Sequence, residues 1–412
     1  MKKLLVVFDV EGVLLPKWRY IPFEVSRKLG VLKFLKILLI GILYEIGVIS
    51  LESALRQIYK NFKGYTVEEL RHYYERLPLI QDVKETFRRL REKGCKIALI
   101  SSGLPQLFIK ELAEKLDADY AYGIELKTLN GKFNGEIGGT VIKKNGKSLV
   151  LKKIQKTENL RPEDCILVAD DRNNLQMFPH VGLKIGFNPD FILTAKADHI
   201  VTEKLSEILP IIFKEENKKH GICLSKNEII RSIIHIGGLL TIIPCIYLIT
   251  PHLMAFLILA VAALYTASEL ARMQGLNFPP FTSITAKAAV KLELYEFALA
   301  PIFYALGIAL SLLIFPQNIA YATIAILTLG DGSASTLGKL LGRTAYPFNK
   351  AKHIEGTIIG LIFAFLGAAA FLNPAKALVG ATVGMLVECF PLPINDNLAV
   401  PLISGFALTV IP

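Results

Sequence analysis

The pattern of hydrophobic and polar residues divides the chain into two halves. Over the first half, to about residue 210, short apolar runs such as LLVVF, IALIS and CILVA alternate with amphipathic stretches of helical period. Such alternation predicts a parallel β-sheet covered by helices. The apolar run from Leu4 to Phe8 ends at Asp9, so it fits a buried strand better than a signal peptide. We therefore expect an α/β domain over residues 1–213.

Apolar segments become much longer in the second half. Several approach the ~20 residues that a helix needs to cross a bilayer, and the shorter ones fit as tilted or packed helices. Residues 214–224 are charged and lack apolar periodicity, which predicts a linker. Residues 225–412 are predicted to form an all-α polytopic membrane domain of about seven transmembrane helices, near 229–250, 252–268, 297–315, 319–337, 356–373, 376–390 and 398–411.

Composition favours a membrane protein over a nucleic-acid-binding one. Hydrophobic residues make up 52% of the chain, its mean hydropathy is +0.44, and its formal net charge is +11. Cytosolic loops rich in Lys and Arg give the same positive balance. The five cysteines include no CxxC pair, so neither a disulfide framework nor a zinc site is predicted. We expect no nucleic-acid partner.

The distribution of charge predicts the orientation in the membrane. Connections at 272–296 and 339–355 carry most of the Lys and Arg residues of the second half, whereas 250–252, 316–318 and 373–376 are nearly uncharged. By the positive-inside rule, the charged connections and the N-terminal domain face the cytosol. We expect a multi-pass protein of the cell membrane with a cytosolic N-terminal domain.

Four polar clusters of the first half follow predicted strands or open a helix. A carboxylate that ends the first strand can attack phosphorus, and a second one two residues later lies on the same side of an extended segment. Asp9 is therefore the predicted nucleophile and Glu11 the proton shuttle. Ser101 is expected to hold phosphoryl oxygens, together with backbone N–H groups. Lys147 is expected to neutralise the charge that Asp9 and a phosphate bring together.

Oxygen ligands suited to Mg²⁺ are predicted at the same place, with Asp170 as the main ligand after the last strand of the site. Each of these polar residues alone is more often a turn or cap residue. Four clusters in order indicate a phosphoryl-transfer site that acts on a phosphomonoester. The predicted metal ligands are Asp9, Glu11, Asp170, Asp171 and Asn174.

The segments FDVEGVLLP, LISSG, GKSLVLKKI and LVADDRNN resemble the haloacid dehalogenase-like hydrolases, nearest to the phosphoserine phosphatase group, over roughly residues 1–205. The resemblance implies a Rossmann-like α/β domain, an aspartyl-phosphate intermediate, Mg²⁺, and a helical cap at about residues 16–79. The last motif of that group usually reads Gly-Asp-Gly-x-Asn-Asp, whereas this chain has ADDRNN. A non-catalytic regulatory module is the alternative.

The predicted cap contains a strongly apolar stretch, FLKILLIGILYEIGVI, at residues 34–49. Lys36 and Glu45 interrupt it, so a transmembrane span is not predicted. One interpretation is the buried face of a cap helix. The other is a face that rests on the membrane or binds a lipid chain, which would suit a lipid phosphate substrate.

A second site is predicted in the membrane half, where small residues surround Asp331. Such residues let backbone amides and hydroxyls approach phosphates while the acid holds Mg²⁺. Alternatively, they are helix-packing contacts, and the neighbouring basic residues mark the cytosolic side. No GxxxxGK[ST] loop occurs. The predicted phosphate-binding residues are Gly330, Gly332, Ser333, Lys339, Arg343, Lys350 and Lys352.

The segments GDGSASTLGKLLGR, PFNKAKHIEGTIIG and VECFPLPINDNLAVPL resemble the polyprenol kinase family of dolichol and phytol kinases over about residues 225–412. The resemblance implies CTP as phosphoryl donor and an isoprenoid alcohol as acceptor. The residues that match as nucleotide and metal ligands are Asp331, Lys339, Lys350, Lys352, Glu355, Asp396 and Asn397. Of these, Asp331 is expected to be catalytic, and Asp331 and Asp396 are expected to bind the metal.

Together these patterns predict a bifunctional membrane enzyme that joins a phosphomonoester hydrolase or phosphotransferase to a CTP-dependent polyprenol kinase. One alternative makes the membrane domain a cytidylyltransferase that forms a CDP-lipid, with the first domain acting on lipid phosphates or only regulating. Another makes the membrane half a transporter.

Overall fold

The computed structural model describes the chain except for residues 1–2, 17–30, 46–47, 76, 203, 215–225, 274–275, 277, 280, 289–296 and 412. The predicted linker, apart from Lys214, and part of the predicted cap lie outside the described residues. Two compact units are present: Met1–Leu193 with Ala197–Glu216, and Thr194–Lys196 with Asn217–Pro412. We describe each unit by itself.

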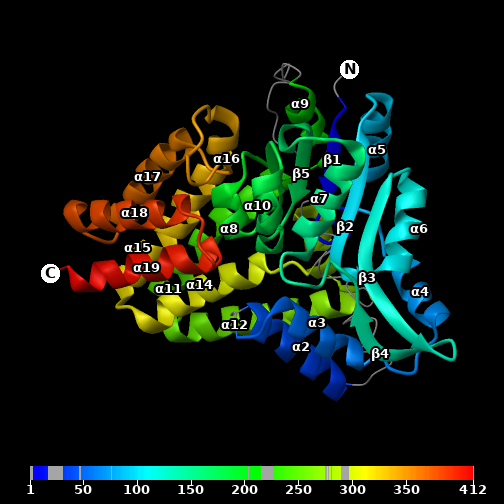
Figure 1. Cartoon of the computed structure of the whole chain (residues 1–412). Helices are drawn as coiled ribbons and strands as arrows, with labels where there is room; N and C mark the ends of the chain where they lie inside the picture. The colour runs from blue at the N-terminus through cyan, green and yellow to red at the C-terminus, as the bar shows by residue number, and fades with distance from the viewer. Residues whose placement is uncertain are drawn as a thin grey trace. The chain divides into compact units, whose positions relative to one another are not determined.

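A seven-stranded sheet forms the centre of the first unit, in the order β4-β3-β2-β1-β5-β6-β7 (Figure 1). All neighbouring strands are parallel except β3 and β4, which form an antiparallel hairpin. This topology confirms the predicted Rossmann-like α/β sheet. The strands are β1 Leu5–Phe8, β2 Lys96–Pro105, β3 Tyr120–Leu129, β4 Lys132–Gly138, β5 Cys165–Ala169, β6 Leu183–Phe187 and β7 His199–Val201.

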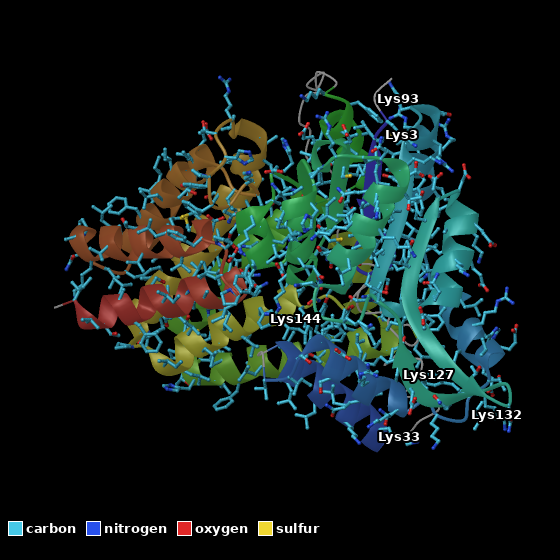
Figure 2. The ribbon with its side chains drawn as sticks, viewed as in Figure 1. Lys3, Lys33, Lys93, Lys127, Lys132 and Lys144 are labelled. Carbon is cyan, nitrogen blue, oxygen red and sulfur yellow. The ribbon has the colours of Figure 1, made fainter. Side chains whose placement is uncertain are left out.

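Burial explains why the central strands are continuous apolar runs. All four residues of β1 and all five of β5 are buried, as expected where helices cover both faces of a parallel sheet. The edge strand β4 belongs to a charged hairpin, on which Lys127 and Lys132 are exposed (Figure 2). Charged side chains of this kind disfavour pairing of the open edge with another chain.

Helices occupy the described part of the predicted cap and surround the sheet. In the cap, Ser50 accepts a hydrogen bond from the N–H of Ser53 and so begins α3, which buries Ala54, Leu55 and Tyr59. The helices of this unit are α2 Val31–Glu45, α3 Leu51–Lys60, α4 Val67–Glu75, α5 Val83–Glu92, α6 Gln106–Leu116, α7 Gly146–Glu158, α8 Phe191–Lys196 and α9 Ile208–Phe213.

The second unit is helical in its described residues (Figure 1). A π-helical turn at Ile326–Asp331 joins α15 and α16 into one continuous helical segment. The α-helices are α10 Lys226–Gly237, α11 Ile242–Tyr247, α12 Pro251–Met273, α13 Phe281–Ala288, α14 Ala300–Ile314, α15 Gln317–Ala325, α16 Gly332–Leu341, α17 Ile354–Ala369, α18 Pro374–Cys389 and α19 Asp396–Val410.

Two helical stretches of the described chain, Lys226–Tyr247 and Pro251–Arg272, are long and apolar enough to cross a bilayer. Three shorter apolar helices are Ala300–Ile314, Ile354–Ala369 and Asp396–Val410. Length and composition alone do not distinguish such helices from the core helices of a soluble protein. The predicted count of about seven transmembrane helices therefore stays a prediction.

Candidate functional site

The register of the central strands brings three of the four polar clusters, those of Asp9, Ser101 and Asp170, to one edge of the sheet. Phe8 pairs with Leu99 of β2 on one side and with Val168 of β5 on the other. The N–H of Asp9 then donates to the carbonyl of Val168 at 3.0 Å. Because the carboxyl ends of parallel strands meet at one edge, residues shortly after each strand lie close together.

Lys147, in the first turn of α7, forms a buried ion pair with the predicted nucleophile. Its Nζ lies 2.8 Å from Oδ2 of Asp9, and the two side chains are only 2% and 5% exposed. Burial by itself would lower the pKa of Lys147, but the carboxylates of Asp9, Asp171 and Glu11 outweigh it, and the pKa is raised. The ammonium therefore stays charged and compensates Asp9.

Three carboxylates of the predicted metal set converge. Asp9, Asp170 and Asp171 each offer one oxygen, and these atoms lie within 4.8 Å of one another. Asp170 is 1% exposed. Several carboxylate oxygens in a small space suit a hard divalent cation such as Mg²⁺. The donor set therefore fits the predicted metal.

Asn174 lies between Lys147 and the carboxylates. Its Oδ1 accepts a hydrogen bond from Lys147 Nζ at 2.9 Å. Its Nδ2 donates to Oδ2 of Asp9 at 2.5 Å and to Oδ1 of Asp171 at 2.9 Å. Because an ammonium must face the amide oxygen and carboxylates must face the amide nitrogen, this orientation is fixed by chemistry. Asn174 orients the carboxylates in this arrangement, and its role as a metal ligand stays a prediction.

Glu11 and Ser101 lie together. The hydroxyl of Ser101 donates to Oε2 of Glu11 at 2.7 Å. The same hydroxyl oxygen accepts from the N–H groups of Gly103 at 3.2 Å and Leu104 at 2.9 Å. Glu11 was predicted as a metal ligand and as a proton shuttle. The structure places its carboxylate on Ser101, outside the three-carboxylate group.

Two buried cap tyrosines support the turn that follows Ser101, and sequence reasoning missed both. Tyr59 of α3 donates to the carbonyl of Gly103 at 2.7 Å, and its hydroxyl lies 3.4 Å from that of Tyr74 of α4. Burial raises the pKa of both phenols, and the charge of Glu11 raises them further. The helical spacing of Tyr59 from Ala54 and Leu55 marks its buried face but not its partner.

A third cap residue contacts the loop that follows β5. The hydroxyl of Tyr44 on α2 donates to Oδ1 of Asn173, and the guanidinium of Arg172 lies 5.6 Å from the centre of the Tyr44 ring. Asn173 in turn donates to Oδ2 of Asp171 at 3.0 Å. This chain of contacts joins the apolar cap helix to one of the three carboxylates.

The second predicted site divides into two groups of side chains. In the first group, Nε2 of His235 on α10 lies 3.3 Å from Oδ2 of Asp331 and 2.9 Å from Oδ1 of Asn397 on α19. Asp331 is 8% exposed. The sequence thus predicted two members of this group, and His235 is the residue that connects them.

The predicted phosphate cradle at Gly330–Ser335 is not formed by the backbone. These residues continue one helix from the π-helical turn into α16, so the amides of the segment are used within the helix. The hydroxyl of Ser333 donates to the carbonyl of Leu329 at 2.5 Å. A Cβ on Gly330 would meet Cβ of Ala364 at 2.8 Å, and one on Gly356 would meet Cα of Gly338 at 2.8 Å. Gly330 and Gly356 thus lie at close helix–helix contacts, and binding of phosphate by this segment stays a prediction.

The second group is centred on Lys352, in the connection before α17. Its Nζ forms an ion pair with Oε1 of Glu388 on α18 and lies 3.4 Å from Oδ2 of Asp396. Glu388 is 1% exposed. The structure thus brings the predicted Lys352 and Asp396 together and adds Glu388.

The other predicted residues of the second site have contacts of their own. Lys339 pairs with Oε1 of Glu228 at 2.5 Å. Glu355 accepts hydrogen bonds from the backbone N–H of Arg343 at 3.1 Å and of Thr344 at 3.2 Å and so orders the connection, and its role toward a nucleotide stays a prediction. Lys350 lies in the same connection, between α16 and α17.

Two cavities adjoin Lys352 and its partners. One of about 130 Å³ is lined by residues that include Ser335, Lys339, Lys352 and Glu388. The other, of about 550 Å³, is lined by Phe303, Leu392, Pro393, Ile394, Asn395 and Asp396. Lys352 therefore stands on the wall of one cavity and contacts an acid on the wall of the other.

Glu269, by contrast, is a structural polar contact. It is 0% exposed, pairs with Arg272 at 2.7 Å, and accepts hydrogen bonds from Thr285 at 3.1 Å and from the N–H of Ala298 at 3.1 Å. These partners lie along and after α12, so the carboxylate fixes the chain that follows this helix.

Similarity to known proteins falls on the first unit. Phosphoserine phosphatase of Methanocaldococcus jannaschii is 32% identical over 212 residues, which cover 51% of this chain and 98% of that protein. Phosphoserine phosphatase of Archaeoglobus fulgidus is 32% identical over 203 residues, which cover 49% of this chain and 58% of that protein. A solved structure of substrate-bound phosphoserine phosphatase is 31% identical, with a TM-score of 0.47, and covers 51% of this chain and 99% of that one.

The family comparison agrees with the site and with the resemblance of its motifs. Residues 6–179 match the family described as haloacid dehalogenase-like hydrolase. The first unit is thus a hydrolase domain similar to the phosphoserine phosphatases. Through this N-terminal half, the chain belongs to the haloacid dehalogenase-like hydrolases.

Proposed function

We propose that the N-terminal domain hydrolyses a phosphomonoester through an aspartyl-phosphate on Asp9. The observation that carries the proposal is the placement of Asp9 against Lys147 at 2.8 Å and within 4.8 Å of the oxygens of Asp170 and Asp171. A carboxylate compensated in this way can receive a dianionic phosphoryl group. Asp9, Asp170 and Asp171 would hold Mg²⁺, which supplies positive charge against the phosphoryl oxygens.

The residues of the domain account for both half-reactions. An oxygen of Asp9 attacks phosphorus and the ester P–O bond breaks, while Glu11 gives a proton to the leaving oxygen. A water then attacks the acyl-phosphate, and Glu11 takes its proton as phosphate leaves. Ser101 and the N–H groups after it hold the phosphoryl oxygens. The hydroxyl of Ser101 donates to Glu11, so a phosphoryl group that takes this hydroxyl would free the carboxylate.

The relatives make phosphoserine the first substrate to test. The full chain, purified in detergent with Mg²⁺, should release phosphate from phosphoserine or from another member of a panel of soluble and lipid phosphomonoesters. Asp9→Asn should lower turnover at least about 10³-fold, because it removes the nucleophile. Asp117→Asn is the matched control, since the side chain of Asp117 is 79% exposed and pairs with Arg91. Equal turnover in the two variants would instead support a non-catalytic regulatory module.

We further propose that residues 225–412 form a multi-pass membrane domain that phosphorylates an isoprenoid alcohol with CTP, on the cytosolic side of the cell membrane. The observation that favours it is the group of Lys352, Glu388 and Asp396 within an apolar helical unit. Ionisable groups among apolar helices are costly and mark functional sites. The proposed reaction is taken from the resemblance of GDGSASTLGKLLGR, PFNKAKHIEGTIIG and VECFPLPINDNLAVPL to the polyprenol kinases.

Isotope position separates this proposal from its rivals. The purified chain is incubated with Mg²⁺, geranylgeraniol, phytol or dolichol, and CTP labelled either in the γ-phosphate or in cytidine. Label from the γ-phosphate on the lipid supports the kinase. Label from cytidine on a lipid phosphate supports a cytidylyltransferase. If neither label reaches the lipid, the transporter alternative is favoured. Since a kinase and a phosphatase on one lipid would cancel each other, we expect the two domains to act on different substrates or to be reciprocally regulated.

A further inference from the structure

Glu388 holds an unused hydrogen-bond acceptor inside the second unit. The residue is 1% exposed, and Oε1 pairs with Lys352, whereas Oε2 has no hydrogen-bond partner. A buried carboxylate oxygen without a partner is destabilising, because it has lost its water without gaining a donor. Natural proteins seldom keep such an oxygen unless a ligand, a water or an ion uses it.

The free oxygen belongs to a residue that lines the cavity of about 130 Å³. At this volume the cavity is too small for a nucleoside triphosphate but large enough for the hydroxyl end of a long-chain alcohol. Gly338 and Gly356, at which α16 and α17 pack closely, form part of its wall. On the other side of Lys352, Asp396 lines the cavity of about 550 Å³, which is large enough for a nucleotide.

The surroundings of Glu388 favour a neutral hydrogen-bond donor over a metal ion. Lys352 already pairs with Oε1 of this carboxylate, which leaves Oε2 as a single buried acceptor, and one acceptor suits a hydroxyl donor better than a hard cation that takes six or more oxygen ligands. In the described part of the chain, the three-carboxylate grouping that suits a metal is the one around Asp9. A hydroxyl group, by contrast, donates one hydrogen bond and adds no charge.

We propose that Oε2 of Glu388 accepts a hydrogen bond from the hydroxyl of the alcohol substrate and is the general base of its phosphorylation. The smaller cavity would bind the alcohol and the larger one the nucleotide, with Lys352 between them. This inference rests on the proposed kinase function and assigns its base. The alcohol O–H bond breaks and its proton passes to Glu388. The oxygen lone pair forms a bond to the γ-phosphorus of the nucleoside triphosphate, the bond from that phosphorus to the β,γ-bridging oxygen breaks, and nucleoside diphosphate leaves. Glu388 then releases the proton to water.

The test compares Glu388→Gln with Glu269→Gln in the full chain, purified in detergent, with CTP, Mg²⁺ and a prenol that wild type phosphorylates. Both variants remove a carboxylate charge from a buried residue paired to a cation, but Glu269 lies in a purely structural network. Removal of a general base lowers turnover by about 10²- to 10⁴-fold. We expect that loss in kcat for Glu388→Gln, with the KM for CTP within about threefold of wild type, and near-wild-type kcat for Glu269→Gln.

A second substrate separates proton removal from packing. An analogue with fluorine on the carbon next to the carbinol has a more acidic hydroxyl and needs less help from a base. The loss of kcat in Glu388→Gln should therefore shrink at least about tenfold with this analogue. If Glu388→Gln does not fold, Glu388→Asp, which withdraws the carboxylate by one methylene, should lose at least about tenfold in kcat with an unchanged KM for CTP.

Four results would overturn the assignment. Equal loss with both alcohols would make Glu388 a packing residue. A raised KM for CTP with unchanged kcat would make it a nucleotide ligand. Wild-type kcat in Glu388→Gln, or in Glu388→Asp where that variant is used, would remove it from the reaction. If wild type transfers no γ-phosphate to any alcohol, both the kinase proposal and the assignment of its base are wrong. The first three results contradict only the assignment of Glu388 as the base.

Discussion

Replacement of Lys147 by methionine should destabilise the N-terminal domain strongly when no divalent cation is present. The attraction between Lys147 Nζ and Asp9 Oδ2 at 2.8 Å is about 6 kcal/mol at an effective dielectric constant near 20. Since the lysine also loses its own desolvation cost, removal of one partner of such a buried pair costs about 3–5 kcal/mol net. The carboxylates of Asp9, Asp170 and Asp171 would then lie together uncompensated.

Hydrogen exchange of the full chain measures this cost locally. A loss of 3–5 kcal/mol corresponds to an increase of between about 100-fold and about 4000-fold in exchange of the amides of β1 through global opening. Millimolar Mg²⁺ should restore most of the protection, because the cation replaces the missing charge among the carboxylates. Lys152→Met, on the exposed side of α7, is the control and should change exchange little.

The double variant Asp9→Asn with Lys147→Met provides the refuting result. Loss of both partners leaves no uncompensated charge from this pair, so the double variant should be more stable than Lys147→Met alone. If Lys147→Met and Lys152→Met exchange alike, or if the costs of the two single changes simply add, the buried ion pair is not what compensates Asp9.

Three further predictions test other parts of the account. Because the folded pKa of Lys147 is raised, its stabilisation is complete below the ordinary lysine pKa of about 10.4 and is lost only as pH rises through the folded value. The difference in unfolding temperature between wild type and Lys147→Met should therefore be constant from about pH 7 to 9, and a difference that disappears in that window would contradict the raised pKa. Ser101→Ala should lower kcat/KM for phosphomonoester hydrolysis about 10²-fold, since it removes a donor to the phosphoryl group; a loss under threefold in steady-state assays would exclude that role. Gly356→Ala should cost about 1–3 kcal/mol in thermal unfolding of the full chain in detergent, because a Cβ there lies 2.8 Å from Cα of Gly338; an unchanged midpoint would show that α16 and α17 do not touch at these glycines.

The catalytic edge of the sheet was predictable because its chemistry follows strand ends. Asp9 and Asp170 directly follow apolar runs, and the parallel register joins these ends at one edge. No such rule locates the cap contacts, since Tyr44, Tyr59 and Tyr74 carry no motif and meet their partners across long stretches of chain. Their positions depend on how the cap helices fold back toward the site.

Polar residues with more than one possible partner account for the remaining differences. The sequence shows that Asn174 carries an amide. It does not show that the ammonium of Lys147 donates a hydrogen bond to the oxygen of that amide. Likewise, small residues around Asp331 suit either a phosphate cradle or close helix packing, and the sequence does not show that this segment continues one helix. The central role of Glu388 depends on Lys352, which lies 36 residues earlier in the chain.

The most direct measurement of the central claim is detection of the aspartyl-phosphate itself. The full chain is mixed with Mg²⁺ and a ³²P-labelled phosphomonoester that it hydrolyses, quenched in acid and digested, and the label is located by mass spectrometry. We predict acid-stable label, removed by hydroxylamine, on Asp9 and none in Asp9→Asn. Label on another residue, or hydrolysis without any labelled protein under conditions that slow the second step, would contradict the account.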